Sequence, residues 1–217
     1  GIFADIATAD AIGHIAWNAD GSRIAFILQT QVPEQNDVRE LGFVDVSAMP
    51  IETGILQTNR PATGYPVNWM RDGRLLFAAE NPEANPETGL NDEIDLFAVV
   101  PSETPELLGT FAFGGECGGG SDLPADWRYW SEIGGMDVFL TLADTPFGIV
   151  HSADCAGSQL ALLDPTTGES NVIAENFGKA VVSPDGTRVA GVARDYTTEP
   201  LTSTLVIYDL ATGTSRT

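Results

Sequence analysis

The chain has 217 residues, of which 43% are hydrophobic and 19% are charged, a balance typical of a folded globular protein. Its 31 acidic residues against 10 basic ones give a net charge of −21. Such a surface repels phosphate backbones and anionic lipid headgroups, so nucleic acid and membrane surfaces are excluded as expected partners. Cationic ligands, divalent metals and basic proteins remain open, although the simpler interpretation is that the charge keeps the protein soluble. No apolar run reaches the ~18 residues of a transmembrane helix.

A strand–turn–strand pattern recurs along the chain, with apolar residues on both sides of each turn. In the clearest turn, Pro184-Asp185-Gly186, proline presets φ and glycine can adopt a positive φ. Such a turn brings the chain back antiparallel to itself as a hairpin. Repetition of an all-β unit at roughly 40 to 50 residues indicates propeller blades. The copies are Ile15–Phe26, Val67–Phe77, the degenerate Leu140–Val150, and Val181–Gly191.

A second repeated turn supports the same interpretation. Leu162–Gly168 and Ile207–Gly213 each end an apolar strand with Asp and place Thr-Gly before a further strand. The two signatures are in phase, which predicts an all-β fold, a β-propeller of four-stranded antiparallel blades. Trp17 and Trp69 are expected to pack between blades.

We expect a single domain over residues 1–217, with about four blades that form part of a larger ring or of a ring completed by another chain. The expected blade ranges are 13–58, 65–113, 136–174 and 179–217, with a glycine-rich insertion at 114–135.

A long acidic loop in the second blade, residues 80–93, suggests a calcium site. Carboxylate and amide oxygens are the ligands that calcium prefers. The loop lacks the Asp-x-Asp-x-Asp-Gly spacing of a specific calcium motif, so we favour a solvated acidic loop. The candidate ligands are Asn91, Asp92, Glu93 and Asp95.

The insertion at 114–135 is the most individual part of the sequence. Glycines on both sides permit backbone conformations that are closed to other residues. It has neither the G-x-x-x-x-G-K-[ST] spacing nor the following helix of a phosphate-binding loop. Either its aromatic residues pack against the blades, which we favour, or they form a platform for a ligand. The platform residues would be Trp127, Arg128, Tyr129 and Trp130.

The two cysteines, Cys117 and Cys155, pair or stand free, and we predict a disulfide between them. On the chain-entropy model, closing this loop would stabilise the fold by roughly 4 kcal/mol. An even cysteine count and strong acidity favour an oxidising, exported setting, extracellular or periplasmic. Because the chain begins at Gly1 without an initiator Met, we expect that a leader or a longer N-terminal region has been removed or left out.

Catalytic signatures are sparse. His14 and His151 fall in different blades, and the H-E-x-x-H, C-x-x-C and G-x-S-x-G motifs are absent. Ser158 and Ser170 are expected in turns, with no evident base. For His14 we expect a partly buried, hydrogen-bonded position rather than catalysis or metal binding. We therefore predict no catalytic residues in this chain.

The repeats resemble the TolB-like, WD40-related β-propeller repeat, whose consensus is W-S-P-D-G-x-x-I-A-F followed by I-Y-x-x-D-x-x-T-G. The match is close at Ser183–Ala190 with Ile207–Gly213, and good at Trp17–Phe26 and Trp69–Phe77. It covers nearly the whole chain outside the insertion and implies the propeller architecture. Propellers of this kind act as periplasmic scaffolds, as sugar or peptide binders, and as substrate-gating domains of peptidases, so the resemblance implies less about function.

Two functions follow as hypotheses. The first is a non-catalytic, exported propeller that binds a protein or small-ligand partner through its inter-strand loops, with no cofactor unless calcium. The alternative is the propeller domain of a larger peptidase, as in the prolyl oligopeptidases, or of a glycan-processing enzyme. In that case the catalytic residues lie outside this chain, and a G-x-S-x-G elbow beyond residue 217 would reveal the peptidase.

Overall fold

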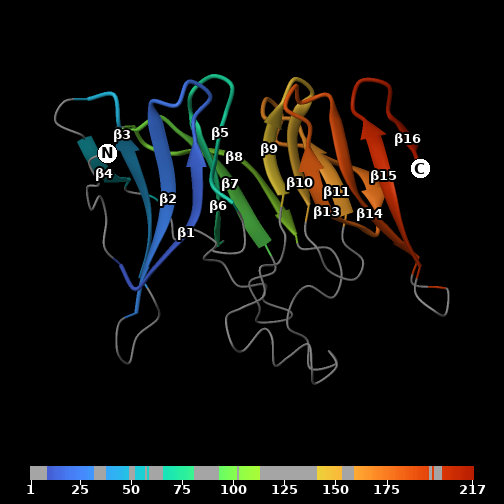
Figure 1. Ribbon diagram of the computed structural model, residues 1–217, viewed down its shortest axis with the longest axis horizontal. Coiled ribbons are helices and arrows are strands. Elements are labelled where there is room, and N and C mark those ends of the chain that lie inside the picture. Colours follow the sequence, from blue (N-terminus) through green and yellow to red (C-terminus); the bar gives the residue numbers. More distant parts are fainter. Residues whose placement is uncertain are drawn as a thin grey trace, which may run out of the picture. The chain divides into compact units, whose positions relative to one another are not determined.

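A computed structural model describes the strands and the turns between them. The described residues are 9–31, 38–48, 52–56, 58, 66–80, 93–101, 103–112, 141–152, 159–195, 197 and 202–217. All regular structure among them is β, arranged in sheets of four strands (Figure 1). This confirms the predicted fold class. Within the described part of the chain, no helix is long and apolar enough to cross a membrane.

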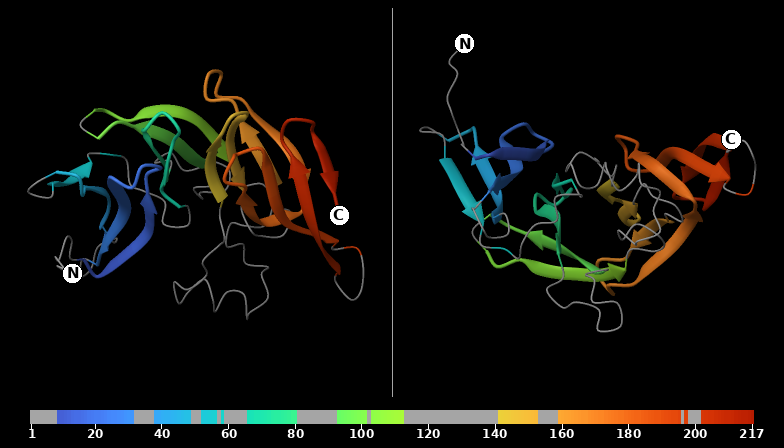
Figure 2. Two further views of the ribbon diagram at one scale, coloured as in Figure 1. Left: turned by 45° about the horizontal axis from the view of Figure 1, so that its top comes forward. Right: turned by 90° about the horizontal axis from the view of Figure 1, so that it is seen from below.

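Each sheet contains consecutive strands in chain order, hydrogen-bonded to their neighbours (Figures 1 and 2). The first sheet is β1 (Ala11–Trp17), β2 (Arg23–Thr30), β3 (Val38–Asp45) and β4 (Glu52–Leu56). The second is β5 (Asn68–Trp69), β6 (Leu75–Glu80), β7 (Glu93–Val99) and β8 (Glu106–Ala112). The third is β9 (Thr141–Thr145), β10 (Gly148–Ser152), β11 (Gln159–Leu163) and β12 (Ser170–Glu175). The fourth is β13 (Phe177–Val182), β14 (Arg188–Asp195), β15 (Thr202–Asp209) and β16 (Thr214–Arg216).

This meander gives every sheet two unlike ends. The first strand runs into a short turn, the second runs back, the third returns toward the same end, and the fourth leaves it. The hairpin turn and the turn between the third and fourth strands therefore share one end, which we call the turn end. The connection between the second and third strands lies at the opposite end, which we call the loop end. The fourth strand of each sheet ends, and the first strand of the next sheet begins, at the loop end.

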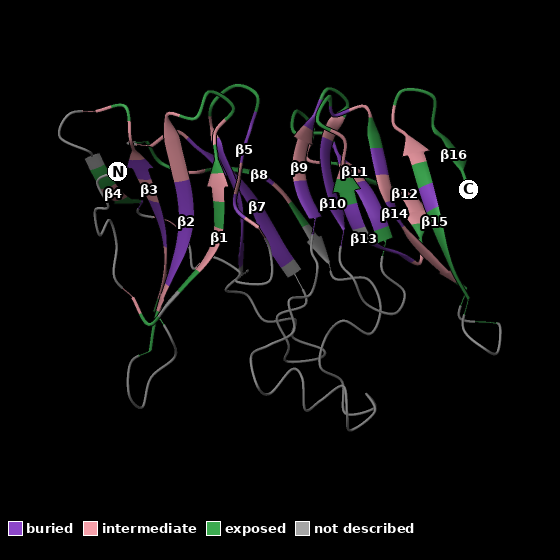
Figure 3. Cartoon of the chain, in the orientation of Figure 1, coloured by how far each residue is buried: buried purple, intermediate pink, exposed green. Residues whose placement is uncertain are grey.

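The described residues form two compact units, one within residues 1–80 and 95–108 and the other within 81–94 and 109–217. In the first unit, apolar side chains of the first and second sheets share one core (Figure 3). The rings of Phe77 and Phe97 stack there, with centroids 5.5 Å apart. The indole Nε1 of Trp69 donates a hydrogen bond to the Ala16 carbonyl, 3.2 Å away, and so ties β5 to β1. The core residues are Ala25, Ile27, Leu41, Leu56, Val67, Trp69, Leu75, Phe77, Ala79, Phe97 and Val99.

In the second unit, the third and fourth sheets pack on each other around a core that includes Phe177 and Val189. Two buried hydroxyl groups cross-link these sheets: Thr141 donates to the Ala180 carbonyl, and Ser152 Oγ donates to the Phe177 carbonyl at 3.1 Å. Buried carbonyls with such partners avoid the cost of an unsatisfied polar group. The rest of this core is Val150, Leu160, Ala180 and Val206.

The first and fourth sheets share a bulge in their first strands. The register shifts between Gly13 and Ala16 in β1, and between Gly178 and Val181 in β13. In each case two residues face one on the partner strand, which is the definition of a β-bulge. His14, the first of the two bulge residues in β1, has a φ of 47°, an unusual value for a residue other than glycine.

The structure corrects the role predicted for Trp17. Trp69 is 9% exposed and packs in the core between the first two sheets, as expected. Trp17 is 56% exposed. It pairs with Ile24 in register, so it points to the face of the first sheet that is turned away from the second. The two tryptophans occupy equivalent positions, but only Trp69 has a described neighbouring sheet to pack against.

Candidate functional site

The first-signature turns at the turn end are closed by their own polar groups. In the first sheet, the Asp20 carboxylate accepts from the Ser22 N–H at 2.8 Å, and Asn18 Oδ1 accepts from the Arg23 N–H at 2.9 Å. Gly21 has a φ of 72°, which glycine adopts without steric strain, as the turn pattern in the sequence predicts. In the second sheet, Asp72 accepts from the Arg74 N–H and Nε, at 3.0 and 2.7 Å.

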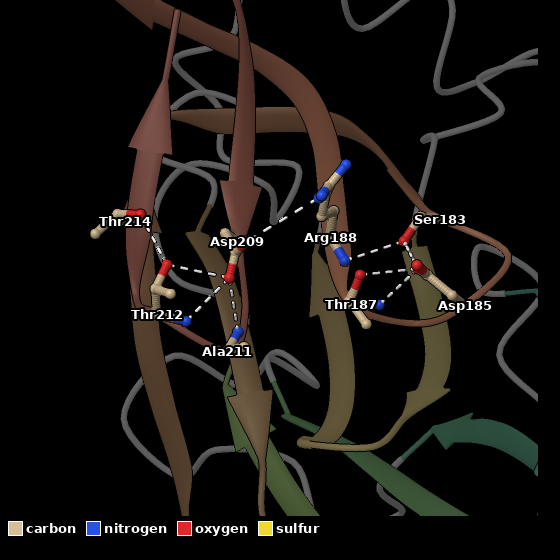
Figure 4. A network of polar contacts seen from close by, with 8 residues as sticks. All are labelled: Ser183, Asp185, Thr187, Arg188, Asp209, Ala211, Thr212 and Thr214. Atoms are coloured by element: carbon tan, nitrogen blue, oxygen red, sulfur yellow. Dashed lines mark hydrogen bonds and ion pairs between the residues drawn. The ribbon is translucent and has the colours of Figure 1, made fainter.

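The fourth-sheet turn shows the same arrangement most fully (Figure 4). Asp185 Oδ1 accepts from Ser183 Oγ at 2.6 Å and from the Thr187 N–H and Oγ1, at 3.0 and 2.9 Å. These donors, the Ser183 hydroxyl foremost, lower the pKa of Asp185 from 3.8 to about 2. Ser183 Oγ also accepts from the Arg188 N–H at 3.0 Å. Each polar group of this turn therefore serves the turn itself.

The second-signature turns are built in the same way. Asp209 accepts from the N–H groups of Ala211 and Thr212, at 3.1 and 3.0 Å (Figure 4). Asp164 accepts from the Thr166 N–H at 2.8 Å. The pKa values of Asp164 and Asp209 are lowered, chiefly by these backbone hydrogen bonds. Such Asp turns satisfy backbone groups locally.

An arginine links the two turns of a sheet, a feature that sequence reasoning missed. Arg23 Nε lies 3.2 Å from Asp45 Oδ2 in the first sheet, and Arg188 Nε lies 4.0 Å from Asp209 Oδ2 in the fourth. Each pair is directly opposite in the strand register. The signal was present: both arginines stand two residues after the turn glycine, and both aspartates end the third strand. The turn end is thus a structural network whose carboxylates are occupied.

Most of the predicted functional residues belong, by their sequence positions, to connections that leave the loop ends of the sheets. Residues 81–92 join β6 to β7, residues 113–140 join β8 to β9, and residues 153–158 join β10 to β11. All three connections begin and finish at the loop ends of their sheets. Several predicted residues lie outside the described part of the chain: the candidate binding residues Trp127, Arg128, Tyr129 and Trp130, the cysteines Cys117 and Cys155, and the candidate calcium ligands Asn91 and Asp92.

Of the calcium candidates, two fall within the described strand β7. Glu93 is its first residue, and Asp95 is a strand residue with 8% exposure. Among the described residues, no group of three or more metal-binding side chains comes together. The calcium site therefore remains a prediction that depends on Asn91 and Asp92.

His151 and Ser170 form a pair that the sequence did not reveal. Ser170 was expected in a turn without a base, but it begins β12, and its Oγ lies 2.8 Å from His151 Nε2. His151 is in β10 and is 6% exposed, and Ala161 of the intervening strand, its register partner, is small. Burial lowers the pKa of His151 from 6.5 to about 4, because the interior disfavours the charged form. At neutral pH the imidazole is neutral and is a weak base.

Four-stranded antiparallel sheets that run in chain order, with consecutive sheets sharing an apolar core inside each unit, define the class of protein as a β-propeller. The two repeated turn signatures and the solved structures below make the fold that of the TolB-like propellers.

No family model and no curated protein matches the sequence. The chain is similar to TolB from Acinetobacter baumannii, with 16% identity over 95% of this chain and 43% of that one, and a TM-score of 0.57. It is similar to a puromycin hydrolase, with 21% identity over 96% of this chain and 28% of that one, and a TM-score of 0.59. It is also similar to the β-propeller domain of the trilobed protease from Pyrococcus furiosus. The identity is 17% over 91% of this chain and 54% of that one, and the TM-score is 0.54. The chain thus spans 28% to 54% of the length of these structures, and the likeness is one of fold.

Proposed function

We propose that this protein is a non-catalytic propeller that binds a partner at the loop ends of its sheets. The observation that carries the proposal is the contrast between the two ends. The carboxylates of the turn end are engaged by backbone N–H groups, hydroxyls and arginines, which leaves them to hold the turns. The long connections leave from the loop end, and inter-strand loops on a rigid scaffold are where propellers and other folds carry recognition.

The chemistry of the partner follows from the sequence of these connections. Trp127, Arg128, Tyr129 and Trp130 are of the residue types that dominate interaction hot spots. The acidic residues of the 80–93 segment and the net charge of −21 favour a cationic or basic partner. An exported location, extracellular or periplasmic, and a Cys117–Cys155 disulfide belong to the same proposal.

The test measures binding of a synthetic lysine-rich peptide by titration calorimetry at physiological salt. Replacing Trp127 and Trp130 with Ala should raise the dissociation constant by about tenfold or more, while the melting temperature stays nearly unchanged. The matched control is Asp164→Asn at the turn end, which removes one negative charge and should leave binding close to wild type. If Asp164→Asn weakens binding as much as the tryptophan changes do, binding is not specific to the loop ends, and the proposal fails.

A peptidase propeller domain is the second candidate, favoured by the likeness to a puromycin hydrolase and to an acylaminoacyl peptidase from Pyrococcus horikoshii. A glycan-processing enzyme has parallel support from an oligogalacturonate lyase, of which the chain spans 52%. A fluorophosphonate probe, which labels activated serines, separates chemistry in this chain from binding. We expect no labelling. Labelling that disappears in Ser170→Ala would make the Ser170–His151 pair catalytic and overturn the scaffold role.

A further inference from the structure

An Asp-Gly pair is a place where a protein chain can form isoaspartate without an enzyme. The amide nitrogen of the glycine attacks the side-chain carboxyl carbon of the aspartate, and glycine has no Cβ to hinder this approach. The N–Cγ bond forms, and the carboxyl O–H leaves as water together with the amide proton, which gives a succinimide ring. Water then opens the ring. Opening at the main-chain carbonyl gives isoaspartate, and opening at the other carbonyl restores aspartate.

Each Asp-Gly pair of this sequence lies in a first-signature turn, and the turn holds both reacting groups. The glycine N–H donates to the carbonyl of the residue three positions earlier, at 3.1, 3.0 and 2.8 Å in the first, second and fourth sheets. The carboxylate accepts from the N–H two positions later, at 2.8, 3.0 and 3.0 Å. Succinimide formation must break both bonds, so further contacts of the carboxylate decide which turn reacts. The pairs are Asp20-Gly21, Asp72-Gly73 and Asp185-Gly186, and the sequence contains no Asn-Gly pair.

The fourth-sheet turn is held most firmly. Asp185 also accepts from the hydroxyls of Ser183 and Thr187, at 2.6 and 2.9 Å (Figure 4). Its pKa of about 2, lowered by these donors, leaves little of the protonated carboxyl whose O–H must depart. Gly186 is buried, and a Cβ there would lie 2.7 Å from Cδ of Pro146 in the third-sheet turn. The extra backbone methylene of isoaspartate therefore has no room in this turn.

An arginine holds the second-sheet turn. Arg74 Nε donates to Asp72 Oδ2 at 2.7 Å. Arg74 Nη1 in turn donates to Oε2 of Glu106, in β8, at 2.6 Å. The carboxylate of Asp72 is thereby tied to a second strand of its sheet, and both of its oxygens are occupied.

The first-sheet turn has neither of these anchors. Asn18 stands where the fourth sheet has Ser183, and its side chain contacts Ser22 Oγ and the Arg23 N–H. Arg23 pairs with Asp45, not with the turn aspartate. The main partner of Asp20 is Ser22, the residue directly after the glycine. A Cβ at Gly21 would meet no described atom within 4 Å, so this turn has room for a longer backbone.

We propose that Asp20-Gly21 is the site at which the folded chain forms isoaspartate, and that the polar contacts of the other two turns protect Asp72 and Asp185. The product has one more methylene in the backbone and a free α-carboxylate. It is therefore a substrate for the class of enzyme that methylates such carboxylates with S-adenosylmethionine. This inference goes beyond the proposed function, because it assigns a covalent change to the turn end of the first sheet and not a partner to the loop ends.

The experiment incubates the folded 217-residue chain at mildly acidic pH for several weeks. Mass spectrometry with electron-transfer fragmentation, which distinguishes isoaspartate from aspartate, then measures each Asp-Gly pair. Residue 20 should carry at least about fivefold more isoaspartate than residue 72 or 185, because each hydrogen bond that must break slows the reaction severalfold. A folded chain without this excess at residue 20 would overturn the proposal.

The urea-denatured chain is the control for local sequence. Without the turn contacts, the excess at residue 20 should largely disappear. An equal excess in the denatured chain would mean that the neighbouring residue types decide the rate, and it would overturn the proposal.

Two variants test the contacts directly. Asn18→Ser combined with Ser22→Thr gives the first-sheet turn the hydroxyl groups of the fourth, so isoaspartate at residue 20 should fall by about threefold or more. Arg74→Met removes the side-chain donor from Asp72, so isoaspartate at residue 72 should rise by a similar factor. Residue 185 is the internal reference in both. Circular dichroism checks folding, and Arg74→Gln serves if Arg74→Met does not fold. Unchanged isoaspartate in either folded variant would overturn the proposal.

Discussion

The first and fourth sheets have the same strand order, the same register in their first three strands, the same bulge and the same Asp-Gly turn. Even so, Leu41 is buried against a neighbouring sheet, and Leu205 at the equivalent position is exposed. The local sequence pattern therefore specifies the sheet, and the neighbouring sheet decides how much each residue contributes to stability. The predictions below test that division, from the largest expected effect to the smallest.

The most direct test truncates the two equivalent leucines. Leu41→Ala should lower the free energy of unfolding by about 2–5 kcal/mol, because it removes apolar contacts and leaves a cavity in a packed core. Leu205→Ala should cost less than about 1 kcal/mol, because that side chain is exposed. Urea unfolding followed by circular dichroism measures both. Equal losses would mean that the faces do not differ in solution as they do in the structure.

Burial also sets the pH response of the third sheet. The pKa of His151 is lowered from 6.5 to about 4, so between these values the unfolded chain binds a proton that the folded chain does not. Stability should therefore fall as pH drops from 6.5 toward 4, by about 3 kcal/mol in full. Thermal unfolding of His151→Gln should lack this loss. Ser170→Ala keeps the histidine buried, so this control variant should retain the loss of stability. A similar loss in His151→Gln would show that His151 is not its cause.

Gly191 and Gly13 differ in the space that an added methyl group would find. A Cβ added at Gly191 would overlap the buried ring of Phe177, whereas one at Gly13 meets nothing within 4 Å. Gly191→Ala should therefore destabilise the protein by about 1–3 kcal/mol through overpacking. Gly13→Ala should be nearly neutral in the same unfolding measurement. The reverse order would show that the ring of Phe177 moves aside without cost.

The smallest effect is expected at the turn end. The pKa of Asp185 is lowered to about 2, so its hydrogen bonds stabilise the turn fully above pH 3.8 and are lost as the pH falls through about 2. Asp185→Ala should lower the melting temperature at neutral pH, and the difference from wild type should vanish near pH 2. Asp185→Asn keeps one acceptor oxygen and should lie between the two. A difference that persists unchanged at low pH would contradict this account.

Among the candidate sites, the sequence predicted the turns correctly and the packing only in part. The positive φ of Gly21, Gly73 and Gly186 follows from the turn chemistry alone. The pairing of His151 with Ser170 could not be predicted from the sequence. It links two strands separated by a third and depends on the small side chain of Ala161 between them. The aromatic, cysteine and acidic groups of the connections lie outside the described residues, so those predictions await experiment.

By itself, the sequence determined the all-β class, the repeated hairpins and the Asp-centred turns of this protein. These features depend on residues within a few positions of one another, and turn preferences and strand alternation act at that range. Only the tertiary structure decided that Trp69 is buried and Trp17 exposed, although both stand at the same place in the repeat. The reason is that burial is a property of the opposing surface, which comes from a sheet that lies far away in the sequence.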